Sequence, residues 1–261
     1  MPSREIRDMT ALDERFVASC THVGETEEWD RAAERRLAWL HRMYEQGLRV
    51  KVALLDGQPV GFLYLLPIEV SSWGPAGRDL AVIQCLCVKN EAQGHGLGRS
   101  LLAAAEVEAR DQGAKGLVVT AYYHDFWFMP ATFFENCGYQ IAWREGEHAL
   151  LWKVFDPAAE PPRPLQRRYT CSPVSGKVVV DLFWSSSCLT TETEAQRVRE
   201  VAAEFSEAVV LHEYCTDDPI VRDHYGLMRG IFINGSEIGW GYEAPREGIR
   251  SAIRNALGDT A

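Results

Sequence analysis

The sequence predicts an α/β protein with two domains, a larger one followed by a smaller one. Three observations support this prediction. Residues 81–121 have the order strand, glycine-rich loop, helix, strand, which indicates a parallel crossover. A second alternation of strands and helices begins near residue 177, and a proline-rich segment separates the two regions. Each region is long enough to bury a core of its own.

The composition is that of an ordinary globular chain. Of 261 residues, 46% are apolar and 25% are charged, which excludes a disordered or fibrous protein. The net charge of −10, without a basic stripe, argues against nucleic acid or an anionic membrane as a partner. No apolar stretch approaches the roughly 20 residues that span a bilayer, and the first residues lack a signal-peptide core. We therefore expect a cytoplasmic protein.

Seven cysteines are scattered along the chain, and their spacing matches no metal or disulfide framework. There is no C-x-x-C pair, no H-E-x-x-H sequence and no zinc-type Cys/His spacing. In a reducing compartment such cysteines remain thiols. We expect no metal site.

Local patterns predict the elements of the first domain. Apolar residues recur at helical spacing in residues 28–46 and 100–110. Asp56-Gly57 tolerates the positive φ angles of a tight hairpin, so the runs on either side should pair as strands. The expected order is strand 4–9, helix 28–46, strands 50–55, 59–66 and 81–88, helix 100–110, strand 116–121, helix 131–136 and strand 148–155.

The domain boundary is predicted by proline. Four of the twelve prolines lie in residues 156–164, where they stiffen the chain and remove hydrogen-bond donors. We expect domains at 1–155 and 169–261, joined by a linker at 156–168. Thr191 followed by Glu194 matches a capping box and predicts a helix start. The expected elements after the linker are strand 177–184, helix 192–205, strand 209–213, hairpin 230–239 and helix 246–257.

The most informative segment is the loop that contains Gly94, Gly96 and Gly98, between a strand and an amphipathic helix. Glycine lets a ligand approach the backbone closely, and the unpaired amides at a helix start favour an anion such as a pyrophosphate. No Gly-Lys-Ser/Thr follows, and the spacing is G-x-G-x-G and not the dinucleotide G-x-G-x-x-G. The alternative is a glycine-rich helix entry that binds nothing.

The loop also carries a family resemblance. Gln93-x-x-Gly96-x-Gly98 after strand 81–88 resembles the acyl-CoA motif of the GNAT superfamily of N-acyltransferases, and Phe134-Glu-Asn-Cys-Gly-Tyr139 resembles a later segment of that superfamily. The likeness covers residues 1–155 in element order, and it implies an α+β mixed sheet. It implies that acetyl-CoA is the co-substrate. The implied cofactor-binding residues are Leu86, Cys87 and Val88 through their main chain, Gln93, Gly94, His95, Gly96, Leu97, Gly98, Arg99 and Ser100 in the loop, and Phe134.

The sequence departs from the family pattern at the residues that move protons. The tyrosine that usually donates a proton is Phe134 here, a frequent asparagine is Trp127, and a frequent basic glutamate is Val82. The replacement candidates are Tyr122, Tyr123 and His124, just after strand 116–121, with Glu69 as a base acting through water. The alternative is that the aromatic side chains only pack and that His124 and Glu69 are solvated.

The second domain has a weaker resemblance. Residues 178–188 resemble the strand and active-site turn of thioredoxin-like proteins, and residues 230–235 resemble their later hairpin. Thioredoxin chemistry requires two cysteines, but the first position is Ser185 and only Cys188 remains. Arg229 stands where such folds usually have a cis-proline. We expect a binding, docking or substrate-covering domain and not a dithiol enzyme.

Together these features predict an N-acetyltransferase that moves an acetyl group from acetyl-CoA to a primary amine by direct attack in a ternary complex. The acceptor is expected to be a small-molecule or peptide amine, and the C-terminal domain offers a surface for a protein partner or for self-association. Two alternatives stay open. Phe134 and Ser185 favour a non-catalytic CoA-binding or protein-interaction module, and Cys188 allows a thiol-dependent redox protein.

Overall fold

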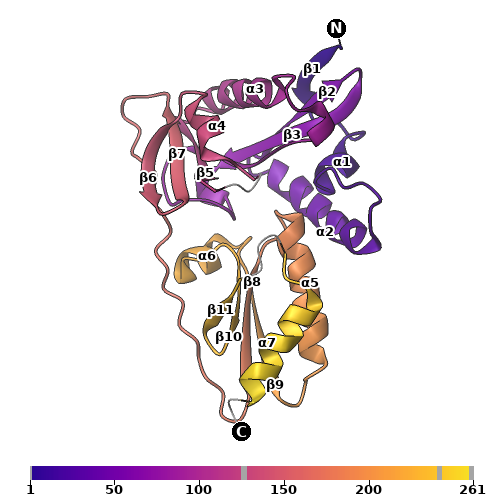
Figure 1. The fold of residues 1–261 in the computed structure, drawn as a ribbon. Helices are drawn as coiled ribbons and strands as arrows, with labels where there is room; N and C mark the ends of the chain where they lie inside the picture. Colours follow the sequence, from indigo (N-terminus) through magenta and orange to yellow (C-terminus); the bar gives the residue numbers. More distant parts are fainter. Residues whose placement is uncertain (1, 125–127, 240–242, 259–261) are drawn as a thin grey trace. The chain divides into compact units, whose positions relative to one another are not determined.

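A computed structural model describes residues 2–124, 128–239 and 243–258 of the chain (Figure 1). It divides into two compact units, and each is described by itself. The first unit consists of Met1–Glu25 and Leu37–Leu165, and the second of Thr26–Arg36 and Gln166–Ala261. Within the described residues, no helix combines the length and the apolar character needed to cross a membrane.

The first unit is built on a seven-stranded mixed sheet. Its strand order is β1-β2-β3-β4-β5-β7-β6. All neighbouring strands are antiparallel except β4 and β5, which are parallel as the crossover pattern predicted. The bounds are β1 Arg4–Asp8, β2 Arg49–Leu55, β3 Gln58–Pro67, β4 Ala81–Val88, β5 Gly116–Tyr122, β6 Gln140–Glu145 and β7 His148–Val154.

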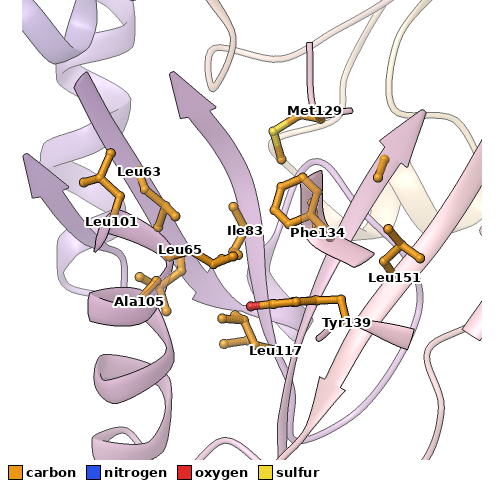
Figure 2. Packing of buried hydrophobic residues seen from close by; sticks show 14 of the residues in the cluster. Leu63, Leu65, Ile83, Leu101, Ala105, Leu117, Met129, Phe134, Tyr139 and Leu151 are labelled. Atoms are coloured by element: carbon orange, nitrogen blue, oxygen red, sulfur yellow. The ribbon is translucent and has the colours of Figure 1, made fainter. Parts of the chain in front are cut away.

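The crossover helix α3 (Leu97–Asp111) packs on one face of this sheet. Its predicted apolar stripe of Leu101, Leu102, Ala105 and Ala109 is buried. Figure 2 shows Leu101 and Ala105 beside the strand residues of the same hydrophobic cluster. The glycine loop joins the end of β4 to the first turn of α3, so this turn lies at that end of the sheet. The other helices are α1 (Glu14–Ala18), α2 (Glu27–Tyr44) and α4 (Ala131–Glu135), with 3-10 turns at Ile68–Val70 and Asn90–Ala92.

Most predicted elements of this unit are present, and the hairpin turn has the expected geometry. Asp56 and Gly57 adopt φ angles of 49° and 77°. Strand β6 and helix α1 were not predicted. Residues of β6 are half-buried or exposed, so the strand lacks an alternating apolar pattern and depends on its pairing with β7. Helix α1 has only five residues, too few to show a helical period.

The second unit contains a four-stranded sheet with the order β11-β10-β8-β9. Strands β8 and β9 are parallel, and β10 runs antiparallel to both β8 and β11. One face forms a core with two helices through Val180, Val198 and Ile249. The bounds are β8 Val178–Trp184, α5 Leu189–Ala203, β9 Val209–Cys215, α6 Pro219–Tyr225, β10 Gly230–Ile233, β11 Ser236–Ile238 and α7 Arg246–Gly258.

The predicted capping box of α5 is wrong. The helix begins one turn earlier, with Cys188 at the N-cap. The Thr191 hydroxyl donates to the carbonyl of Ser185 at 2.6 Å, and the Glu194 carboxylate accepts from the backbone N–H of Ala244 at 2.8 Å. Thr191 therefore binds the turn that precedes the helix, and Glu194 serves a tertiary contact, so neither side chain forms the predicted box.

The boundary between the units also differs from the predicted linker. Ala76 and Arg163 exchange two backbone hydrogen bonds of 2.8 and 2.9 Å, so the proline-rich segment is tied to the first unit as far as Leu165. Residues 26–36, the beginning of α2, group with the second unit. There Arg197 makes an ion pair of 2.6 Å with Glu28, and Arg35 pairs with the buried Glu192.

Candidate functional site

The central feature of the first unit is the point where β4 and β5 part. They pair only over Ala81–Ile83 and Leu117–Val119. Beyond this point β4 continues to Val88 on β3, and β5 continues to Tyr122 on β7. The register of β3 and β4 shifts next to Gln84, which indicates a bulge of the kind that bends a strand. The β5-facing edge of residues 84–88 therefore has no strand partner within the described part of the chain.

The glycine loop follows β4 directly. Gly94 and Gly96 have φ angles of 79° and 75°, and Gly96 is the N-cap of α3, without a side-chain cap. The first amides of α3 have no partner within the helix. Among the described residues, the backbone N–H groups of residues 94–99 donate no hydrogen bond to the backbone of another segment. The left-handed turns thus expose a row of amides at the positive end of the helix dipole.

The polar side chains of this loop are used within it. Gln93 Nε2 donates to Asn90 Oδ1 at 3.0 Å, and His95 Nδ1 lies 3.0 Å from the carbonyl oxygen of Gln93. Ser100 Oγ donates to the carbonyl of Gly96 at 3.2 Å. These side chains brace the loop, so its backbone amides remain for a ligand. Leu97 is buried, whereas Arg99 is exposed on the first turn of α3.

A second group of polar side chains lies at the end of β5. The ring of Tyr122 stacks on the imidazole of His124, with 4.9 Å between the ring centres and 10° between the ring planes. It meets the ring of His148 edge-on, with 5.1 Å between the ring centres and 87° between the planes. Tyr122 and His148 are register partners of β5 and β7. His148 was missed by sequence reasoning, because only strand pairing places it beside Tyr122. This cluster of one phenol and two imidazoles can donate and accept protons.

Tyr123 differs from its neighbour. Its hydroxyl donates to Glu135 Oε1 at 2.6 Å, and the guanidinium of Arg144 lies 3.7 Å from the centre of its ring. Burial and the bond to Glu135 raise the pKa of Tyr123. The Tyr123 proton is thus held by a carboxylate, and Tyr122 is the better candidate for proton transfer.

The expected place of Glu69 near the aromatic segment is wrong. Pro67 pairs with Ala81, the first residue of β4, because β3 and β4 are antiparallel. Glu69 therefore lies at the start of β4 and β5, whereas Tyr122 lies at the end of β5. The Glu69 carboxylate accepts from the backbone N–H of Asp79 at 2.8 Å. Trp127, which stands at the position of a frequent asparagine in the family pattern, lies outside the described residues.

Phe134 is packed in the core of the first unit. It is fully buried, with ring centres 5.0 Å from Phe133 and 5.7 Å from Tyr139. Figure 2 shows the ring between Met129 and Tyr139. Its predicted contact with the cofactor stays a prediction, because the ring lies in the core beneath the loop. The ring of the neighbouring Phe133 lies 3.4 Å from the place of a Cβ at Gly98.

Substitution Phe134→Tyr is expected to destabilise the first unit by about 1–3 kcal/mol, because the new hydroxyl enters an apolar core without a partner. Chemical denaturation of the full chain, followed by circular dichroism, measures the change. Phe133→Tyr is the matched control, since Phe133 is only half-buried. A Phe134→Tyr protein as stable as the wild type, with higher turnover, would contradict this and restore the position as a proton donor.

In the second unit, the turn after β8 is occupied by its own hydrogen bonds. Ser185 is fully buried, and its hydroxyl donates to Asp217 Oδ1 at 2.6 Å. Burial raises the pKa of the Cys215 thiol to about 11. All seven cysteines lie in the described residues, and none of them forms a disulfide there. The described residues contain no group of three or more His, Cys, Asp or Glu side chains suited to a metal ion.

Comparisons with known proteins point to one family. The family described as Acetyltransferase (GNAT) family matches residues 10–139. Similar solved structures include the PaiA N-acetyltransferase of Thermoplasma acidophilum in complex with coenzyme A, at 19% identity, 59% of this chain, 99% of that chain and a TM-score of 0.44. Another is YncA, a putative acetyltransferase of Salmonella typhimurium with acetyl-CoA. It is 20% identical, the match covers 60% of this chain and 97% of that chain, and the TM-score is 0.46. A ribosomal-protein-alanine N-acetyltransferase of Brucella melitensis is 23% identical. That match covers 58% of this chain and 99% of that chain, with a TM-score of 0.45. No curated protein matches the chain.

Proposed function

Residues 10–139 form a GNAT acetyltransferase domain, and from this premise we propose that the protein transfers an acetyl group directly to a primary amine in a ternary complex. The protein is an acyl-CoA-dependent N-acetyltransferase with acetyl-CoA as co-substrate. The observation that carries the proposal is the row of unpaired amides at residues 94–99, beside the parted ends of β4 and β5. The acceptor is a small-molecule or peptide amine.

The loop fits the diphosphate of coenzyme A by its chemistry. Six successive backbone N–H groups lie at a helix start, and two of the glycines have the left-handed conformation that turns amides toward one side. Both glycines are exposed, and a Cβ at Gly94 would meet no atom within 4 Å. The open edge of Leu86, Cys87 and Val88 supplies main-chain partners for the pantetheine amides.

Acetyl transfer requires two proton movements at the parted strands. The amine nitrogen forms a bond to the acetyl carbon, the thioester C–S bond breaks, the nitrogen loses a proton and the thiolate gains one. Tyr122 and His124 are the candidates for these roles, and His148 joins them through its contact with Tyr122. An imidazole accepts a proton near neutral pH, and a phenol donates one. We assign the proton for the thiolate to Tyr122.

Substitution Tyr122→Phe is therefore expected to lower kcat by about 100-fold, with little change in the affinity for acetyl-CoA. The assay measures acetyl transfer to a panel of primary amines, with both substrates varied. Intersecting initial-rate lines are expected, because both substrates are bound before transfer. Tyr123→Phe is the matched control, since its hydroxyl is bound to Glu135, and it should retain most of kcat.

Three results would contradict these assignments. A larger loss of kcat in Tyr123→Phe than in Tyr122→Phe would exchange the two roles. Parallel initial-rate lines would indicate an acetyl-enzyme, with Cys87 on β4 as the first thiol to test. Binding of CoA without turnover of any amine would favour the alternative of a non-catalytic CoA-binding module, which the buried Phe134 suggests.

For the second unit we propose a thioredoxin-like domain that docks a partner. The parallel pair β8–β9, followed by an antiparallel hairpin and a closing helix, supports this proposal. Ser185 in place of the first cysteine is fully buried and bound to Asp217. A thiol-dependent redox role would have to depend on Cys188 alone, and the buried turn disfavours it.

A further inference from the structure

Arg4 of the edge strand β1 contacts the glycine loop, 91 positions later in the chain. Its Nη1 donates to the carbonyl oxygen of His95 at 2.8 Å. The same atom lies 4.0 Å from the place of a Cβ at Gly96. Arg4 is exposed, and it forms no ion pair with any residue that the structure describes. An arginine has five N–H donors, so the contact with His95 leaves donors and a full charge beside the loop.

The bonded carbonyl belongs to a peptide unit of the amide row. The carbonyl of His95 and the N–H of Gly96 are the two ends of one planar peptide. A charged donor on the carbonyl fixes the orientation of that plane. It also polarises the peptide, which makes the N–H at the other end a stronger donor. Gly96, with its φ of 75°, has no side chain to hold this orientation.

We propose that Arg4 is a positioning residue of the coenzyme A site, which holds and polarises the His95–Gly96 peptide so that its N–H donates to the diphosphate. This inference rests on the proposed function of the loop. The diphosphate is the favoured anion, and not the 3′-phosphate of the ribose, because the Gly96 N–H lies within the row of amides at the start of α3. The positive charge of Arg4 adds long-range attraction for the same anion.

Calorimetry on the full chain tests the proposal with two ligands, coenzyme A and dephospho-CoA, which lacks the 3′-phosphate. Arg4→Gln is expected to raise the Kd of both ligands by about tenfold, which is the effect of losing one charged hydrogen bond. Arg4→Lys should restore part of the loss, because lysine keeps the charge without the planar fork. The slope of log Kd against log salt should be shallower in Arg4→Gln. Arg78→Gln is the matched control. It removes the same charge from an exposed arginine before the start of β4, and it should leave both affinities unchanged.

The possible outcomes separate the proposal from its rivals. Unchanged affinity in Arg4→Gln overturns it. A loss confined to coenzyme A also overturns it, because Arg4 would then bind the 3′-phosphate. A third outcome also overturns it: ligand-free Arg4→Gln has a lower melting temperature, and Arg4→Lys loses as much affinity as Arg4→Gln. The contact would then only stabilise the packing of β1 against the loop. If the wild type binds neither ligand, the proposed function itself fails.

Discussion

Substitution Gly96→Asp is expected to weaken the binding of acetyl-CoA by about 1000-fold. Gly96 is the N-cap of α3, and no side chain caps the helix. Gly96 has a φ of 75°, outside the extended region from which an N-cap side chain accepts from the first amides of the helix. The new carboxylate would therefore act through its negative charge beside the amides that the diphosphate needs, and it would repel the diphosphate. Calorimetry with acetyl-CoA measures the change in Kd.

Gly96→Asn is the matched control for this substitution. Asparagine has the shape of aspartate and tolerates a positive φ, but it carries no charge. We expect Gly96→Asn to raise the Kd of acetyl-CoA by about tenfold. The difference in Kd between the two variants then measures the effect of the charge. Equal affinity of Gly96→Asp and the wild type would show that the diphosphate binds elsewhere.

Substitution Gly226→Ala is expected to destabilise the second unit by about 4 kcal/mol or more. Gly226 ends α6 with a φ of 65°. A Cβ there would lie 1.8 Å from the carbonyl oxygen of Gln166 and 2.4 Å from its carbonyl carbon. Both are backbone atoms, so no side chain can rotate away to relieve the overlap. The segment that enters the second unit would have to leave α6.

Gly176→Ala is the control for the cost of the backbone conformation alone. Gly176 has a φ of 70°, and a Cβ there would meet no atom within 4 Å. Alanine in this conformation costs about 1 kcal/mol. Urea denaturation of the full chain, followed by circular dichroism, compares the two variants with the wild type. Equal destabilisation by the two substitutions would mean that the contact between α6 and Gln166 is not part of the folded unit.

Much of the fold was predictable because the signals are local. The stripe of Leu101, Leu102, Ala105 and Ala109 defined the buried face of α3, since residues three and four apart share one side of a helix. Asp56-Gly57 predicted its hairpin through backbone conformation alone. Local signals also misled. Thr191 and Glu194 have capping-box spacing, but the helix starts at Leu189 and both side chains bind other parts of the unit.

The crossover of β4, α3 and β5 and the glycine loop could be predicted from neighbouring residues alone, because helical periodicity and the positive φ of glycine are local properties. The side chains that surround these elements come from distant parts of the chain and are known only from the folded structure. It placed Arg4 on the carbonyl of His95 and His148 against Tyr122, and it moved Glu69 to the other end of the sheet. These placements depend on strand order and register between distant segments, and a single strand carries no record of its partner's register.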